Sequence, residues 1–185
     1  MRRGAHERPR GGLAPGPRSA FTRALERLAL RDHSEEELRR ALARAGYPGD
    51  EVEAAIERLR DRRFVDDDAY ALRFAQSRIG RRGQGRHRVR QALHRRGVPR
   101  ATIERGLEAA LREVSEAEAL DEVARRYWRS HERDEPRRRM RKLCDHLLRR
   151  GFPGSLVRDR VRALWPSWSE MLDGAEPQEL DENDA

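Results

Sequence analysis

The chain is poor in cysteine, aromatic residues and long apolar runs. Its one cysteine, Cys144, excludes an internal disulfide. Aromatic residues make up 5% of the 185 residues and stretches of alternating β-branched residues are absent, so β-sheets are not expected. No apolar run approaches the roughly 20 residues that a membrane-spanning helix needs, and residues 1–18 lack the apolar stretch of a secretory signal. We therefore expect a soluble, cytoplasmic protein.

Lysine is also nearly absent, since Lys142 is the only lysine among 41 basic residues. A genome biased towards G and C would explain this preference for arginine without any functional reason. Such a bias does not by itself explain the formal net charge of +8. Arginine presents a planar fork that binds phosphate or carboxylate through two hydrogen bonds. The surplus of arginine therefore predicts an anionic partner, most simply nucleic acid.

The composition of the chain changes at its two ends. Residues 1–18 are rich in Arg, Gly and Pro, and we expect them to form a disordered basic tail. Residues 169–185 are acidic and contain no basic residue, which predicts a disordered acidic tail. Over the whole chain, hydrophobic residues account for 36% and charged residues for 40%. This apolar share suits thin, stacked helices better than one thick core.

Three segments between the tails share one pattern, in which two apolar residues four apart precede a glycine, an apolar residue and a proline. The four-residue spacing places the apolar side chains on one face of a helix. The glycine can take the left-handed conformation that closes a helix, and the proline prevents the helix from continuing. The three segments are Leu38-x3-Leu42-x3-Gly46-Tyr47-Pro48, Val89-x3-Leu93-x3-Gly97-Val98-Pro99 and Leu143-x3-Leu147-x3-Gly151-Phe152-Pro153.

Two more helices complete each copy of this internal repeat. Apolar residues recur six, ten and thirteen residues after each glycine, which predicts a helix that packs on the first. A helix is also expected before each segment, over residues 21–31, 67–79 and 115–130, and the pairs Ser34–Glu37 and Ser115–Glu118 fit capping boxes. The predicted fold is all-α, with three tandem three-helix repeats stacked into an elongated, curved solenoid over residues 19–65, 66–113 and 114–168.

The three copies differ in charge although they share one apolar pattern. Residues 34–61 hold eight acidic and five basic residues. Residues 78–105 hold ten basic residues and one acidic residue, and residues 137–162 hold ten and two. A uniform compositional bias would not produce this division, so we expect an anion-binding surface on the second and third copies. The local acids there are expected to be too few to pair with the arginines.

Helical phase selects the side chains of that surface. With the apolar residues of the two repeat helices buried, the basic residues of those helices point outward. Together with the arginines of the loop before residue 86, they would contact phosphates without sequence preference. The candidate binding residues are Arg78, Arg81, Arg82, Arg86, Arg88, Arg90, Arg95, Arg138, Arg141, Lys142 and Arg149.

Asp66, Asp67 and Asp68 form the one dense carboxylate cluster between the tails. They precede a predicted helix, where aspartate caps exposed backbone N–H groups and opposes the positive end of the helix dipole. Divalent metal binding, as in nucleases, is the alternative, although no second cluster of carboxylates or histidines supports it. We therefore expect a binding protein without a catalytic residue, a metal site or a cofactor.

The middle of the chain resembles the central signature of the RecX family. In that signature an acidic pair and an aromatic–alanine step lead into a basic loop and a helix that ends at glycine. The matching residues are Asp66–Ala71, then Arg78, then Gly85-x3-Val89-x3-Leu93-x3-Gly97-Val98, preceded by Ala24-Leu25-x2-Leu28, Arg31 and Ser34-x3-Leu38-x3-Leu42-x3-Gly46. The resemblance covers about residues 20–166. Arg86 departs from it, because many relatives have proline after the loop glycine.

The resemblance implies a non-enzymatic regulator of the RecA recombinase. RecX-like proteins bind the RecA filament on single-stranded DNA and modulate it, mostly by inhibiting ATP hydrolysis and strand exchange, in recombination, DNA repair and the SOS response. We expect a monomer that meets DNA through non-specific electrostatic contacts. Two alternatives remain open. One is a sequence-specific transcription factor, because three-helix units are also typical of helix-turn-helix domains. The other is a metal-dependent nuclease that uses Asp66, Asp67 and Asp68.

Overall fold

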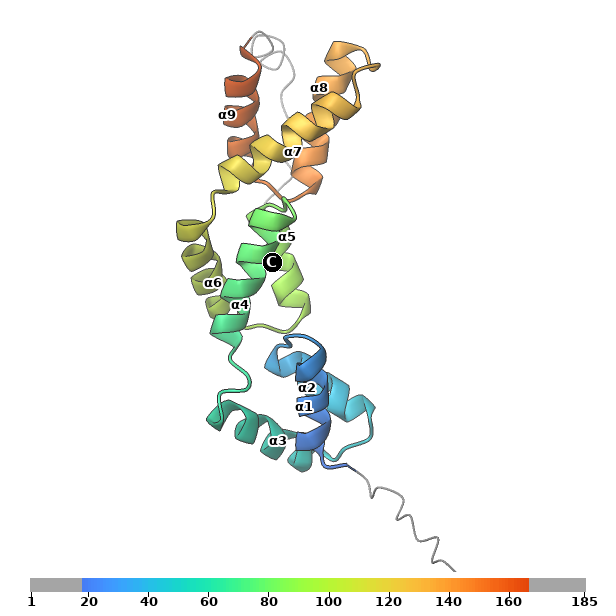
Figure 1. The fold of residues 1–185 in the computed structure, drawn as a ribbon, viewed down its shortest axis with the longest axis vertical. Helices are drawn as coiled ribbons and strands as arrows, with labels where there is room; N and C mark the ends of the chain where they lie inside the picture. Colours follow the sequence, from blue (N-terminus) through green and yellow to red (C-terminus); the bar gives the residue numbers. More distant parts are fainter. Residues whose placement is uncertain (1–17, 167–185) are drawn as a thin grey trace, which may run out of the picture.

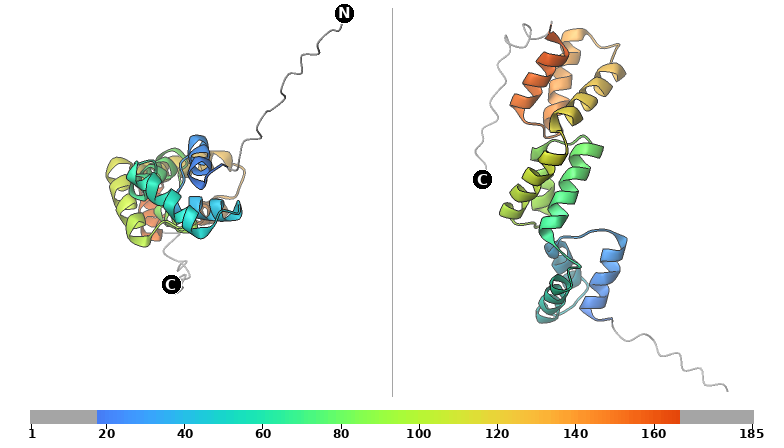
Figure 2. Two further views of the ribbon diagram at one scale, coloured as in Figure 1. Left: turned by 90° about the horizontal axis from the view of Figure 1, so that it is seen from below. Right: turned by 60° about the vertical axis from the view of Figure 1, so that its left-hand side comes forward.

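The computed structural model describes residues 18–166, which form nine α-helices and one short π-helix and contain no β-strand. The helices pack in three consecutive groups of three, stacked end to end in an elongated, gently curved column (Figure 1). A view from another side keeps the groups in the same order (Figure 2). The predicted all-α stack of three-helix repeats is confirmed. Apart from Arg18, the two predicted tails lie outside the described residues, and no helix among those residues is long and apolar enough to cross a membrane.

The first repeat consists of α1 (Ala20–Leu30), α2 (Glu35–Arg44) and α3 (Gly49–Asp61). Ser34 caps α2 through the predicted capping box. Its hydroxyl accepts from the Glu37 N–H, and the Glu37 carboxylate accepts from the Ser34 N–H. The apolar faces of the three helices meet in one buried core, formed by Ala20, Ala24, Leu38, Leu42, Val52, Ala55, Ile56, Leu59 and Val65.

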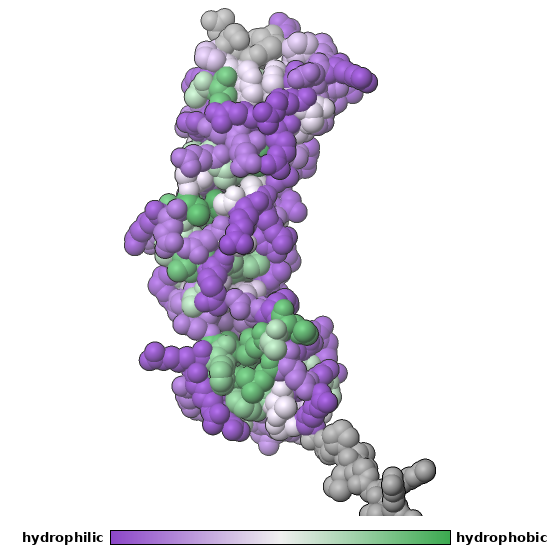
Figure 3. Space-filling view, in the orientation of Figure 1, coloured by the Kyte–Doolittle hydropathy of each residue, from purple (hydrophilic) through white to green (hydrophobic). Residues whose placement is uncertain are grey.

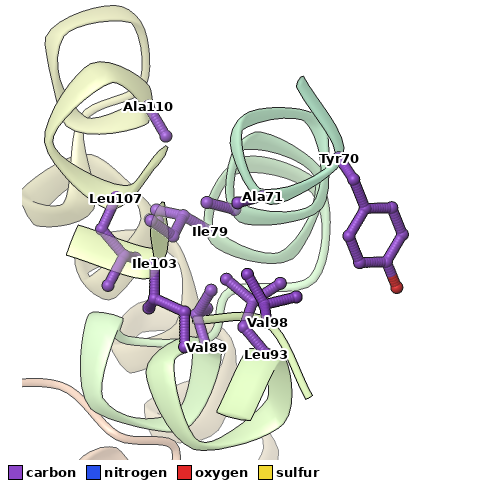
Figure 4. Packing of buried hydrophobic residues seen from close by; sticks show 11 residues of the cluster. Tyr70, Ala71, Ile79, Val89, Leu93, Val98, Ile103, Leu107 and Ala110 are labelled. Carbon is purple, nitrogen blue, oxygen red and sulfur yellow. The ribbon is translucent and has the colours of Figure 1, made fainter. Parts of the chain in front are cut away.

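The second repeat consists of α4 (Asp67–Gln76), the π-helix η1 (Ser77–Arg81), α5 (Arg86–Arg95) and α6 (Arg100–Glu113). The sequence predicts one helix that ends at Ile79, whereas the chain widens into a π-helix after Gln76 and continues to Arg81, with Ile79 fully buried. In Figure 4 the side chains of Ile79, Val89, Leu93, Ile103 and Leu107 point toward one another. Tyr70 lies at the rim of this core, and its hydroxyl donates to Glu37 of α2 at 3.4 Å.

The third repeat consists of α7 (Glu116–Ser130), α8 (Pro136–Arg149) and α9 (Gly154–Leu164). The Ser115 hydroxyl accepts from the Glu118 N–H, which is one half of the expected capping box. Cys144 packs against the core of this repeat, and burial raises the pKa of its thiol to about 11. The core is formed by Leu120, Ala124, Met140, Leu143, Leu147, Phe152, Val157 and Val161.

The three repeat glycines have the predicted left-handed conformation, with φ angles of +89° at Gly46, +76° at Gly97 and +84° at Gly151. Two of them also allow a close approach between repeats. A Cβ atom on Gly97 would lie 2.5 Å from the Cβ of Glu36, and one on Gly151 would lie 2.9 Å from the Cα of Arg88. A Cβ atom on Gly46 would meet nothing within 4 Å. The loops of the second and third repeats therefore dock against α2 and α5 of the preceding repeat.

An acidic residue at the start of each following repeat completes the junction. Asp67, the first residue of α4, accepts from the N–H of Glu35 at 3.0 Å. Glu116, the first residue of α7, accepts from the N–H of Arg86 at 2.6 Å. Glu35 and Arg86 are the first residues of α2 and α5, where backbone N–H groups have no partner within their own helix. Each new repeat thus caps the second helix of the repeat before it.

Candidate nucleic-acid interface

Four arginines crowd together where η1 meets α5, and we call them the arginine cluster. Arg78 lies on η1, Arg82 follows it directly, Arg88 lies in the first turn of α5, and Arg96 follows α5. The pKa of Arg78 is lowered, first by burial and then by the positive charges of Arg82, Arg96 and Arg88. Such crowding of like charges is unfavourable, and a bound anion would relieve it.

Carboxylates do not neutralise this cluster. Within residues 18–166, Arg78, Arg82 and Arg88 have no carboxylate at ion-pair distance, and Arg96 has one long contact of 3.8 Å from its Nε to Glu37. Two of the four guanidinium groups are instead held by carbonyl oxygens. Arg96 Nη1 donates to the carbonyl of Ala92 at 2.8 Å, and Arg88 Nη1 donates to that of Arg149 at 3.1 Å. The positive charge of the cluster therefore remains available to a partner.

Phe74 of α4 lies against two members of the cluster. The guanidinium carbons of Arg78 and Arg96 are each 4.7 Å from the centroid of its ring. At this distance the electron-rich face of an aromatic ring attracts a cation. Phe74 is half-buried against the core of the second repeat, and the Tyr70 ring tilts against it with centroids 5.9 Å apart. The ring is thus fixed in position by the core beneath it.

The third repeat reaches the cluster through the loop after α8. Arg150 Nη1 donates to the carbonyls of Arg82 and Gly83, each at 3.0 Å. Arg150 Nε donates to Nε2 of His146 at 3.0 Å, which requires a neutral imidazole. Burial lowers the pKa of His146, and the charges of Arg150, Arg149 and His131 lower it further. The neutral histidine therefore helps to hold the loop of the third repeat beside the arginine cluster.

Three of the predicted binding residues are paired with carboxylates. Glu116 lies 2.6 Å from Arg86, Glu104 lies 2.7 Å from Arg90, and Asp134 lies 2.9 Å from Lys142. The expectation that local acids are too few for pairing is wrong for these three side chains. The acids come from α7, from α6 and from the loop before α8, so proximity along the chain did not indicate them. These three residues contribute little net charge to the surface.

The other predicted residues are exposed and fall into two groups. Arg81, Arg95 and Arg149 lie on the elements that carry the arginine cluster or dock beside it, whereas Arg138 and Arg141 lie in the first half of α8. A rise of 1.5 Å per residue places Arg138 about 16 Å from Arg149 along this helix. The structure therefore brings one predicted group together around α5 and leaves a second, smaller group at the far end of α8.

Sequence reasoning missed two members of this surface, Arg96 and Phe74. Arg96 follows the last residue of α5, where helical phase no longer indicates direction. Phe74 packs on the core of its repeat, and it also meets two guanidinium groups. The available signal was the spacing of Phe74 and Arg78, which are four residues apart and therefore share a helix face.

The three consecutive aspartates make structural contacts. Asp66 accepts from the N–H of Ala69 at 3.0 Å, which confirms the predicted cap of α4. Asp67 caps α2, and Asp68 pairs with Arg105 of α6 at 2.6 Å. In the part of the chain that the structure describes, no three His, Cys, Asp or Glu side chains are arranged to hold a metal ion.

On the face shown in Figure 3, the first repeat exposes more apolar surface than the other two repeats. In Figure 3 an apolar patch covers part of this repeat, while the second and third repeats are mostly hydrophilic on the same face. Leu30 at the end of α1 is 84% exposed, and Phe64 after α3 is 52% exposed. Leu148, which is 42% exposed beside Arg149 at the end of α8, is an exposed apolar residue within the basic part of the column.

The stacked repeats and the arginine cluster define a helical-repeat protein with a basic surface. Comparison with known proteins identifies the family. Three family models, described as the first, second and third three-helix domains of RecX, match residues 20–59, 66–107 and 115–159. The chain belongs to the RecX family.

Curated relatives and solved structures agree with this assignment. The chain is 33% identical to "Regulatory protein RecX" of Prosthecochloris aestuarii over 80% of this chain and 94% of that protein. It is 34% identical to the protein of the same name from Xanthomonas citri, over 83% and 93% of the two chains. The crystal structure of RecX from Lactobacillus salivarius matches with a TM-score of 0.68 at 18% identity, over 78% and 94%, and shows the fold. A crystal structure of regulatory protein RecX matches with a TM-score of 0.66 at 26% identity, over 74% and 68%.

Proposed function

We propose that this chain is a non-enzymatic regulator that binds the RecA filament on single-stranded DNA and inhibits its ATPase and strand-exchange activities. Membership of a family whose members are named regulatory protein RecX supports a role in the regulation of RecA. Such a regulator acts in recombination, DNA repair and the SOS response. The proposal includes action as a cytoplasmic monomer that needs no metal or cofactor.

The observation that carries this proposal is the unneutralised arginine cluster. A filament on DNA presents phosphates at regular intervals, and guanidinium groups bind phosphate through paired, charge-assisted hydrogen bonds. Arg82 and Arg88 are exposed, and further exposed arginines extend the surface on both sides. Contacts of this kind give affinity without base recognition, which suits a regulator that meets DNA of any sequence.

A titration of RecA ATPase activity on single-stranded DNA tests the proposal. The wild-type chain is compared with Arg82→Glu/Arg88→Glu, Arg138→Glu/Arg141→Glu and a control, Arg112→Glu/Arg126→Glu. All three double variants change the net charge equally at exposed positions, but Arg112 and Arg126 pair with Glu108 and Glu122 on the surfaces of α6 and α7. We expect the first variant to need about tenfold more protein for half-inhibition. The control should behave like the wild type.

Each other outcome has a definite meaning. If the wild-type chain leaves the ATPase unchanged, RecA regulation is refuted. If the control loses as much inhibition as the cluster variant, total charge rather than the arginine cluster is responsible. Strong preference for one duplex sequence would favour a transcription factor, and metal-dependent cleavage that Asp67→Ala abolishes would favour a nuclease.

A further inference from the structure

Phe74 meets two cations on one aromatic ring, and the like charges of the two guanidinium groups repel each other. The guanidinium groups of Arg78 and Arg96 are each 4.7 Å from the ring centroid, so they lie no farther apart than twice that distance. They come from different elements, η1 and the end of α5, and the chain between them turns through the basic loop. The ring of Phe74 is therefore the common contact that brings these two side chains together.

Both guanidinium groups keep hydrogen-bond donors that have no close partner among the described residues. Arg78 has no carboxylate partner among the described residues. Arg96 donates from Nη1 to the carbonyl of Ala92, but its buried Nε makes no hydrogen bond and only the long contact to Glu37. A buried donor without a partner is costly, as is the proximity of like charges. The cost of like charges would fall if an anion bound to both arginines.

We propose that Phe74 is the positioning residue of a phosphate clamp, in which Arg78 and Arg96 together bind one phosphodiester group of single-stranded DNA. This inference rests on the proposed function, which names single-stranded DNA as the ligand. The planar guanidinium forks match the oxygens of a phosphate, and the ring fixes both forks before the strand arrives. Arg82 and Arg88 lie close enough to Arg78 for their positive charges to lower its pKa, and they would contact the phosphates on either side.

The chain contains a matched arrangement outside this surface. Phe21 of α1 also meets two arginines, with Arg58 at 4.1 Å and Arg62 at 5.6 Å from its ring centroid, and it is half-buried against the core of its own repeat. Arg58 lies within residues 34–61, a segment of the first repeat that holds more acidic than basic residues. Truncation of Phe21 therefore disturbs the same kind of contact, in a similar environment, without touching the proposed clamp.

The test measures binding of the full chain to a fluorescently labelled oligothymidylate by anisotropy, at several concentrations of sodium chloride. Phe74→Leu should weaken binding about tenfold. It should also make the slope of log affinity against log salt shallower by about 0.7, which corresponds to one lost phosphate contact on a single strand. Phe74→Tyr keeps an aromatic face and should restore both values. Phe21→Leu should bind like the wild type.

Several results would overturn the clamp. They are unchanged binding by Phe74→Leu, a weaker affinity with an unchanged salt slope, or an equal loss in Phe21→Leu. If Phe74→Leu does not fold, as judged by circular dichroism, Arg78→Gln carries the same test, since Arg78 is only half-buried. A wild-type chain that does not bind the oligonucleotide refutes both the clamp and the DNA part of the proposed function. Clamp-dependent binding without any effect on RecA would refute only the proposed function.

Discussion

Replacement of each repeat glycine by alanine separates the cost of backbone conformation from the cost of docking between repeats. Gly46, Gly97 and Gly151 share a left-handed conformation. An alanine in that conformation costs about 1–2 kcal/mol. Gly46→Ala should lose no more than this, because nothing lies within 4 Å of the new methyl group. The first repeat therefore provides the baseline for the other two.

At the two junctions the added methyl group meets the preceding repeat. In Gly97→Ala it would lie 2.5 Å from the Cβ of Glu36, which belongs to a side chain on the first turn of α2. In Gly151→Ala it would lie 2.9 Å from the Cα of Arg88, and the backbone of α5 cannot rotate away. Overpacking of this kind typically costs about 1–3 kcal/mol more. We expect a total loss of about 2–5 kcal/mol for Gly151→Ala, with Gly97→Ala between the extremes.

Unfolding by urea, followed by circular dichroism, gives the three free energies. Amide hydrogen exchange reports the second junction directly, because the N–H groups of Gly85 and His87 donate to the carbonyls of Arg150 and Gly151 at 2.9 Å and 3.0 Å. Gly151→Ala should accelerate exchange at both amides, whereas Gly46→Ala should leave them protected. Equal losses of stability at all three glycines would refute the docking role assigned to Gly97 and Gly151.

Two further predictions concern ionisable groups at the second junction. Because the pKa of His146 is lowered in the folded protein, the stability that this histidine contributes is present above pH about 6.5 and is lost as the pH falls below that value. The midpoint of urea unfolding should therefore fall less steeply with decreasing pH in His146→Gln than in the wild type. Glu116 is only 4% exposed, so Glu116→Ala leaves the Arg86 N–H and guanidinium without their acceptor and should cost about 2 kcal/mol. Glu122→Ala, which breaks an exposed pair with Arg126, should cost below about 0.5 kcal/mol, and equal losses at the two glutamates would contradict the capping role of Glu116.

Features that depend on neighbours along the chain could be predicted from the sequence. The left-handed glycines, the cap at Ser34 and the buried faces of α2, α5 and α8 all follow from residues within one or two helical turns. The π-helix after Gln76 could not be predicted this way, because α4 alone gives no sign of the wider turn that buries Ile79.

Features that join different repeats could not be predicted in the same way. Asp67 was expected to act at the start of its own helix, yet it caps α2 of the preceding repeat. Arg86 was assigned to the binding surface, yet its partner Glu116 is 30 residues away and arrives with the next repeat. The arginine cluster could be predicted only in part for the same reason. Contacts between residues that are distant in the sequence decide which guanidinium groups are paired with carboxylates.

The residues at the junctions also make each repeat specific to its place in the chain. Ser34 and Gly85 each lie twelve residues before the glycine of their repeat, and each donates a hydrogen bond to the glycine-containing loop of the following repeat. The corresponding residue of the third repeat is Arg139, whose large side chain is buried. It lies inside α8, because the N-cap of this helix is Glu135, four residues farther from the repeat glycine than Ser34 and Gly85 are from theirs. At the other end, α1 starts with Ala20, which has no carboxylate to offer a preceding helix. Shuffled copies of these units would lose these contacts, so the junctions make the order of the described repeats specific.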